Sequence, residues 1–374
     1  MVVEYHIRAY DLAGTLKAVI ADEFTFTLSN AVNQVGGFHL TLPYDSPYVA
    51  LRAAKDVFEV WRRVRDVDEA GTVTDAISWY IEGTYLYREA ELRDDGAIQT
   101  FTAHCTSLEE ILAWRVVAYA ALTTSKTKWL ATPTETIMKD LVKWNLTTSA
   151  TAANSRYLNA ALSYSIAGAT LTNQADAAGG TVRDWFCEHR NLLQVLQDLA
   201  ENGGGDFAVV KTGLAAYEFR FYAGQLGTDR SATVLFSLDR GNMADPVYLD
   251  SIVGRPTVAI VGGDGPNDAR AIVNVMGADS SNNQVEAFVD ARGFTTTTSL
   301  TDYGGSQLYR TKAEGRLSFG VLQTPSCLYG RDYVLGDKVS GRAFGVTTTY
   351  KVAGRTVTFT PDGDEQLTIG LNNA

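Results

Sequence analysis

Cysteine and histidine are scarce in this 374-residue chain, which has three of the first and four of the second. Cys105, Cys187 and Cys327 are odd in number and widely spaced, which excludes the disulfide framework of a small secreted domain. This pattern favours a chain made in a reducing cytoplasm, with its thiols buried.

Long apolar runs are also missing. No stretch approaches the ~20 apolar residues that a membrane-spanning helix needs, so we expect no membrane insertion of this chain. Residues 1–10 alternate between apolar and polar as a strand does. They lack the basic region, apolar core and cleavage site of a signal peptide.

Positive charge is in deficit, since 43 acidic residues face 32 basic ones and the net charge is −11. Such a balance argues against a surface that grips nucleic acid or anionic lipid, because both are themselves negative. It is compatible with an acidic lining past which DNA slides without sticking.

Motifs of the common enzyme classes are absent. There is no G-x-S-x-G, so a serine or cysteine triad has no support. Gly262–Gly265 lacks the spacing of a phosphate loop or a dinucleotide fingerprint and predicts a turn. Asp362–Glu365 lacks the twelve-residue ligand loop of a calcium site and predicts a hairpin tip.

The few metal-ligand types are poorly spaced for a metal site. His104–Cys105 and Cys187–His189 could offer ligands, but a C-x-H spacing is too short for a zinc site. His6 and His39 lie on predicted strands and are interpreted as structural. We therefore predict no catalytic, cofactor-binding or metal-binding residues, no cofactor and no enzyme activity.

Two alternatives remain open at this point. Paired carboxylates could hydrolyse a glycosidic bond in any acidic protein, although Glu109–Glu110 begins a predicted helix, where the helix dipole favours carboxylates in any case. The 18 tyrosines, 15 phenylalanines and 6 tryptophans could form a sugar-binding platform. Strand faces and subunit interfaces account for these aromatics better.

What the sequence does contain is a repeated strand pattern. Residues 24–28 and 37–43 alternate apolar and polar side chains, and further strands are predicted at 56–64, 78–88 and 99–105. Several short strands at regular spacing suggest a barrel or a sandwich.

A helical segment follows. Ser107–Glu110 reads as a capping box, and Thr132–Glu135 opens a second helix with proline in its first turn. Residues 147–180 are rich in Ala, Thr, Ser, Asn and Gly and predict a long loop, which at this length is usually functional or interfacial.

The stretch 187–222 predicts a third helix, a glycine stop and a β-hairpin. The apolar positions at helical spacing are Leu192, Val195, Leu196 and Leu199. They predict a buried face, Asn191 can cap the start, and Asn202–Gly203 can supply a left-handed stop. We interpret this stretch as the bridge into a second β-barrel, with the helix packed against the barrel wall.

The second half of the chain is again β-rich, with an insertion. Strands are predicted up to about residue 261 and again from 334 onward, and residues 267–325 contain strands and a helix around Ser306–Glu314. A weak internal echo links Asp56–Val60 and Trp79–Gly83 to Gly336–Ser340 and Thr349–Ala353, which suggests two β modules of similar plan.

These patterns predict an α+β fold that is mainly β, with two tail-tube-like β-barrel modules. The predicted units are a first β-barrel module at 1–105, a helical and loop segment at 106–205, a second β-barrel module at 206–262 plus 326–374, and an inserted α/β unit at 263–325.

The order of motifs resembles the tail-hub, or baseplate-hub-like, proteins at the tail tip of long-tailed bacteriophages (siphophages). The stretches that carry the resemblance are 37–43, 107–117, 190–200 with 205–207, 227–231 with 235–238, and 329–339. They are structural signatures spread over most of the chain, and the resemblance carries over no catalytic residue.

The resemblance implies a structural role in the virion, at the tail tip or baseplate, for a protein made in the host cytoplasm. Three copies would form a pseudo-sixfold ring that adapts the tail tube to the tip and lines the channel through which DNA passes. The implied partners are the distal tail protein, the tape-measure protein and other tail-tip proteins. A tail-associated cell-wall hydrolase and a receptor- or carbohydrate-binding tail module are the alternatives.

Overall fold

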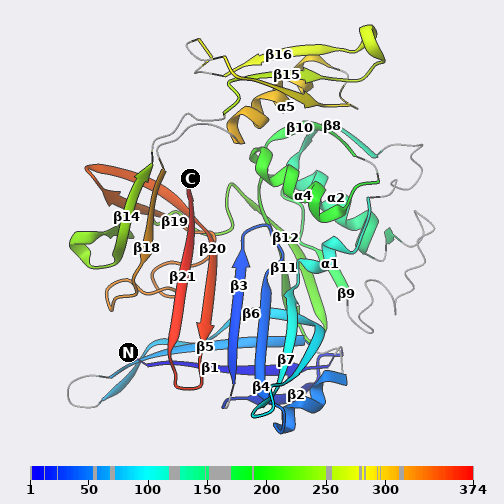
Figure 1. Ribbon diagram of the computed structural model, residues 1–374. Coiled ribbons are helices and arrows are strands. Elements are labelled where there is room, and N and C mark those ends of the chain that lie inside the picture. Colours follow the sequence, from blue (N-terminus) through cyan, green and yellow to red (C-terminus); the bar gives the residue numbers. More distant parts are fainter. Residues whose placement is uncertain are drawn as a thin grey trace.

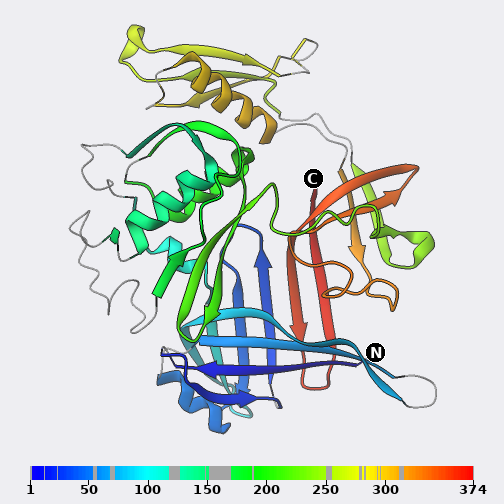
Figure 2. The ribbon, with the colours of Figure 1, turned by 180° about the vertical axis from the view of Figure 1, so that it is seen from behind.

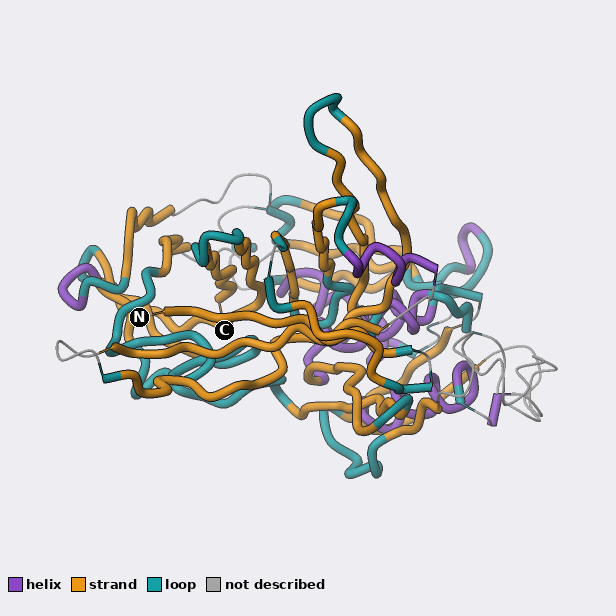
Figure 3. The backbone as a smooth tube through the Cα atoms, turned by 90° about the horizontal axis from the view of Figure 1, so that it is seen from below, coloured by secondary structure: helices purple, strands orange, loops and turns teal. Residues whose placement is uncertain are grey.

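A computed structural model gives the fold. It describes residues 2–11, 13–22, 24–53, 57–67, 72–117, 127–147, 149–150, 170–187, 189–249, 255–277, 280–281, 284–292, 294, 296–310 and 316–373. Much of the predicted 147–180 loop lies outside these residues. Strands dominate the tube view, and most helical segments gather at one side (Figure 3).

One large sheet forms the body of the protein. Its order is β13-β19-β20-β3-β4-β7-β6-β5-β1-β2, with β21 also paired to β20. The strands are β1 (Val2–Tyr10), β2 (Leu16–Ile20), β3 (Thr25–Ala31), β4 (Gly37–Pro43), β5 (Val57–Val67), β6 (Val73–Asp94), β7 (Gln99–Ser107), β13 (Leu235–Ser237), β19 (Lys338–Ala343), β20 (Val346–Phe359) and β21 (Glu365–Asn373). A short 3-10 helix, η1 (Pro47–Ala53), follows β4.

The sheet bends over itself around a first core. β1 and β5 run across the direction of β3, β4, β20 and β21 (Figure 1). Inward side chains of both groups meet in one cluster, which includes Ile7, Phe38, Val60 and Tyr85. Apolar residues at alternate positions build this core because successive strand side chains point to opposite faces.

A second core lies at the other end of the same sheet. It combines β13, β19, β20 and β21 with a two-stranded sheet of β14 (Met243–Leu249) and β18 (Arg316–Val321). Phe236, Tyr333 and Tyr350 are among its buried side chains. The two cores share the sheet because β20 pairs with β3, for example Val357 opposite Leu28.

The fold is therefore mainly β, as predicted, but the two closed barrels are not found. In the part of the chain that the structure describes, no hydrogen bonds join the end strands β2 and β13 to close the sheet. The physical reason is that β3 and β20 use each other as partners, so the two β modules merge into one bent sheet.

The helical unit has its own core. It contains α1 (Glu110–Ala113), α2 (Thr134–Leu146), α4 (Leu192–Leu199), the β8–β10 pair (Thr127–Pro133 and Val182–Cys187), and a sheet of β9 (Thr170–Asn173), β11 (Gly205–Gly213) and β12 (Ala216–Ala223). The helix predicted at Thr132–Glu135 is α2. At the predicted capping box, Ser107 does not cap α1, since its Oγ donates to Glu109 Oε2 and accepts from the Gly36 backbone N–H.

The predicted apolar face and N-terminal cap of α4 are both confirmed. Its four predicted core positions are all buried, and the Asn191 side chain accepts from the Gln194 backbone N–H at 3.3 Å. Helical hydrogen bonding continues through the π turn η2 (Ala200–Gly204), and Gly205 then adopts φ 137°. The helix packs against α1, α2 and the β11–β12 hairpin, and the hairpin belongs to the three-stranded sheet with β9, so the predicted bridge into a second barrel is wrong.

A small α/β unit lies at the far end, above the helical unit (Figures 1 and 2). It has the sheet β16-β15-β17, formed by β15 (Val258–Gly262), β16 (Ile272–Met276) and β17 (Glu286–Asp290). The helix α5 (Thr297–Arg310) covers one face, and the 3-10 helix η4 (Asn267–Ala269) precedes β16. The α5 helix starts at Thr297, nine residues before the predicted start at Ser306, and the predicted end at Glu314 lies outside the described residues.

Strand pairing refines the predicted organisation. β15, expected with the second β module, pairs with β16 and β17, whereas β18, expected in the insertion, pairs with β14. The division of the chain into the four predicted units stays a prediction.

Candidate functional site

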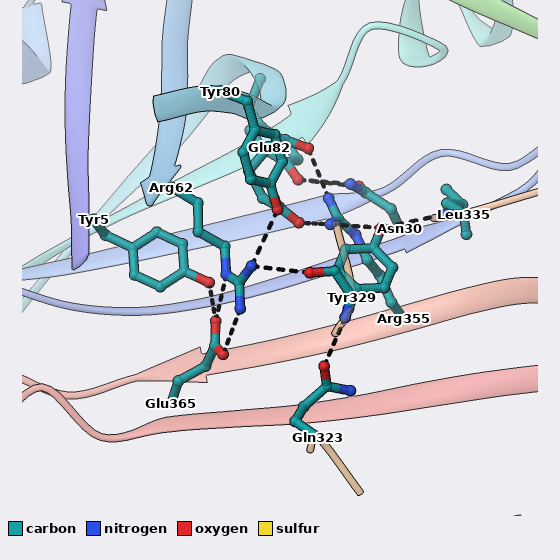
Figure 4. A network of polar contacts seen from close by, with 11 residues as sticks. Tyr5, Asn30, Arg62, Tyr80, Glu82, Gln323, Tyr329, Leu335, Arg355 and Glu365 are labelled. Atoms are coloured by element: carbon teal, nitrogen blue, oxygen red, sulfur yellow. Dashed lines mark hydrogen bonds and ion pairs between the residues drawn. The ribbon is translucent and has the colours of Figure 1, made fainter. Parts of the chain in front are cut away.

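The first feature of interest is a buried polar cluster between the two β cores. We call the set Tyr5, Arg62, Tyr80, Glu82, Tyr329, Arg355 and Glu365 the junction network (Figure 4). Its members come from β1, β5, β6, β20, β21 and the loop before β19. It therefore joins segments from the two ends of the chain.

A bidentate ion pair forms one half of the junction network. Arg62 donates from Nε to Glu365 Oε1 at 2.8 Å and from Nη2 to Glu365 Oε2 at 2.8 Å. The Tyr5 hydroxyl also donates to Glu365. Burial lowers the pKa of Arg62, but its contacts with Glu365 outweigh this effect and raise the pKa above its usual range. Arg62 thus remains a cation, although its side chain is only 3% exposed.

The second half is held by Arg355. Its Nη1 donates to the Tyr329 hydroxyl at 2.8 Å, its Nη2 donates to the Glu82 carbonyl oxygen at 2.7 Å, and its guanidinium pairs with the Glu82 carboxylate. Arg62 Nη1 reaches the Tyr329 carbonyl oxygen at 3.3 Å and so connects the halves. Arg62 pairs with Glu365 and Arg355 pairs with Glu82, so each buried cation of the network has a carboxylate partner.

A buried carboxylate outside the junction network ties the helical unit to the sheet. Asp206 at the start of β11 is 3% exposed. It accepts from Asn33 Nδ2 at 2.9 Å, from the Leu226 backbone N–H at 2.6 Å and from Lys351 Nζ at 2.7 Å. One side chain thereby fixes β11 to the β3–β4 turn and to β20.

A cavity of about 780 Å³ lies between β5, β6 and the β11–β12 hairpin. Three carboxylates line it, namely Glu59, Glu109 and Glu82 of the junction network, so it is the natural place to look for a hydrolytic site. Glu59 is held by Lys211 Nζ at 2.7 Å and Trp61 Nε1 at 3.0 Å. Glu109 accepts from Ser107 Oγ at 2.6 Å, and burial raises the pKa of its carboxyl. The carboxylates of Glu59 and Glu109 therefore hold neighbouring side chains of the cavity wall in place.

The histidines and cysteines do not converge. His39 and His104 face each other across β4 and β7 with their Nδ1 atoms 2.7 Å apart, while Cys105 points into the first core and Cys187 into the helical core. Within the described ranges, no group of three or more His, Cys, Asp or Glu residues is placed to hold a metal ion.

The two segments that were predicted as turns, and not as ligand-binding loops, do lie at the ends of strands. Gly262–Gly265 follows β15, and Asp362–Glu365 forms the β20–β21 turn, with Glu365 turned into the junction network. No described helix is both long and apolar enough to cross a membrane.

The junction network was not predicted from the sequence. A signal was present, because Arg62 lies between Val60 and Val64 at inward positions of β5, and Arg355 precedes Val357 and Phe359 on the inward side of β20. A charge at an inward strand position requires a buried counter-charge. The pattern does not say which distant carboxylate supplies it.

Comparison with known proteins gives the relationship. The sequence matches the family described as "Siphovirus ReqiPepy6 Gp37-like protein" over residues 6–371. No curated protein matches the chain.

Solved structures share the fold over nearly the whole chain. The prophage MuSo2 43 kDa tail protein from Shewanella oneidensis is 11% identical, with 99% of this chain and 98% of that chain covered and a TM-score of 0.59. The tail protein from Neisseria meningitidis is 10% identical, with 98% and 96% covered and a TM-score of 0.57. The prophage tail protein gp18 from Listeria monocytogenes is 9% identical, with 98% and 94% covered and a TM-score of 0.53.

Proposed function

Because the chain belongs to the Siphovirus ReqiPepy6 Gp37-like family and has the fold of phage tail proteins, we propose that it is the structural tail-hub protein of a long-tailed phage. Three copies form a ring at the tail tip, adapt the tail tube to the tip and line the DNA channel. The distal tail protein, the tape-measure protein and other tail-tip proteins are its partners in the virion, and it has no catalytic role.

The observation that carries this proposal is the presence of two β cores on one sheet. Three chains with two β modules each present six modules, which suits a threefold ring that meets a sixfold tube. In this proposal each of the two β cores supplies one module of the ring. The net charge of −11 suits a channel from which DNA must leave without sticking.

Unpaired strand edges supply a means of assembly. Among the described residues, β2 and β13 each have one strand neighbour, and β21 pairs only with β20. An unpaired edge offers backbone donors and acceptors to another chain. The β2 edge also exposes Leu16 and Val19.

Native mass spectrometry of the purified protein and of isolated tail tips tests the proposal. We expect a chain count that is a multiple of three. Val19→Lys should weaken assembly if the β2 edge lies at the contact, whereas Leu130→Lys, at another exposed apolar position, on β8, should not. Any other chain count rejects the trimer. Cell-wall clearing that a single carboxylate substitution abolishes would reject the structural role in favour of a hydrolase.

A further inference from the structure

A cavity of about 630 Å³ lies beside β13, away from the junction network. Three arginines from three separate segments line it. Arg230 precedes β13, Arg240 ends the short 3-10 helix η3 (Leu238–Arg240), and Arg331 lies in the loop between β18 and β19. This concentration of positive charge contrasts with the net charge of −11 for the whole chain.

The carboxylates close to this cavity already accept hydrogen bonds from backbone N–H groups. Asp337 is 1% exposed and accepts from the backbone N–H groups of Thr228 at 2.6 Å and Val334 at 2.9 Å. Asp332 accepts from the Leu328 backbone N–H at 2.7 Å. Asp332 also lines the cavity and pairs with Arg331, whereas Asp337 is not among the lining residues, so three guanidinium groups line the cavity together with one carboxylate.

The arginines retain unused donors. Arg230 donates from Nε to Asp337 Oδ2 at 2.9 Å, and among the described residues its terminal nitrogens donate no hydrogen bond to a carboxylate. Arg331 pairs with Asp332 and also donates to the Pro325 carbonyl oxygen at 2.8 Å. No carboxylate of the described residues pairs with Arg240. The Cys327 thiol on the same wall adds no negative charge, because burial raises its pKa.

We propose that this cavity is an oxyanion-binding pocket, in which Arg240 and the free donors of Arg230 bind a phosphate or carboxylate group. A guanidinium presents its N–H groups in a planar fork that matches two oxygens of either anion. The pocket lies next to β13 at one end of the large sheet, where a phosphorylated ligand or an acidic side chain of a neighbouring tail protein could supply the anion. This assignment is independent of the trimeric ring.

Calorimetric titration of the full-length protein tests the assignment. Inorganic phosphate and succinate serve as separate probes, at an ionic strength held constant with sodium chloride. We expect saturable binding of one or both probes, and Arg240→Ala should weaken it about fivefold or more, because a charge-assisted hydrogen bond is lost. Arg240 is exposed, and no carboxylate in the described part of the chain forms an ion pair with it, so this variant should fold normally, as circular dichroism can check.

Arg342→Ala is the matched control, since Arg342 is also exposed and pairs with Asp239 outside the cavity. It should leave the affinity within about twofold, because its side chain does not reach the pocket. Binding of phosphate alone identifies a phosphate source, and binding of succinate alone identifies a carboxylate source. The assignment is overturned if neither probe binds, or if Arg240→Ala binds as tightly as the unmodified protein.

Discussion

Replacing Glu365 with alanine should loosen the attachment of β21 to the first β module. Glu365 accepts two hydrogen bonds of 2.8 Å from Arg62, and the two side chains are 8% and 3% exposed. Removal of the carboxylate leaves the Arg62 cation buried without its partner. Breaking one side of a buried pair costs about 3–5 kcal/mol.

Local hydrogen exchange is the suitable assay, because a chain with several cores does not unfold as a single two-state unit. A loss of about 3 kcal/mol corresponds to roughly 150-fold faster exchange where exchange follows local opening. We expect this acceleration in the amides of β21 and β1. Gln366→Ala, at the exposed neighbouring position, is the control and should exchange as the unmodified protein does.

A double variant separates burial of a charge from loss of an interaction. Arg62→Leu combined with Glu365→Leu removes both charges, so it should recover much of the stability lost in Glu365→Ala. The reasoning is refuted if Glu365→Ala leaves β21 exchange within about threefold of the unmodified protein, a change too small for an unpaired buried ion. A double variant that is less stable than either single variant would also contradict it.

Three further changes have defined outcomes. Leu196→Asp should abolish soluble, folded protein because it buries a charge in the helical core, whereas Gln194→Asp on the exposed side of α4 should be tolerated; both are read by circular dichroism. Gly205→Ala should lower the melting temperature, because φ is 137° and a β-carbon would lie 2.2 Å from a backbone carbonyl oxygen of β12; an unchanged melting temperature would contradict this. Burial and the neighbouring His104 lower the pKa of His39 in the folded state. The unfolded chain therefore takes up a proton at His39 below about pH 6.5, where the folded state resists doing so. The free energy of unfolding should consequently fall as the pH is lowered through that range. His39→Gln should flatten this dependence in denaturant titrations at pH 5 and 7.5, and an unchanged pH dependence would show that His39 does not titrate as described.

Local patterns in the sequence were sufficient for the elements themselves. The buried face of α4 follows from Leu192, Leu196 and Leu199 at helical spacing, and the Asn191 cap follows from one side-chain oxygen and a backbone N–H three residues away. These interactions are local, so the residues that determine them are close together in the chain. The mainly β class, the scarcity of metal ligands and the acidic balance are likewise properties of the sequence alone.

Pairing between distant segments was decided only by the tertiary structure. Alternation predicts that β3 and β20 are strands, but it does not predict that Leu28 lies opposite Val357 and merges two expected barrels into one sheet. The same limit applies to Arg62 and Glu365, which are 303 residues apart in sequence. An inward charge shows that a partner must exist, and only the packing of the whole chain determines which of its 43 acidic residues is placed to neutralise it.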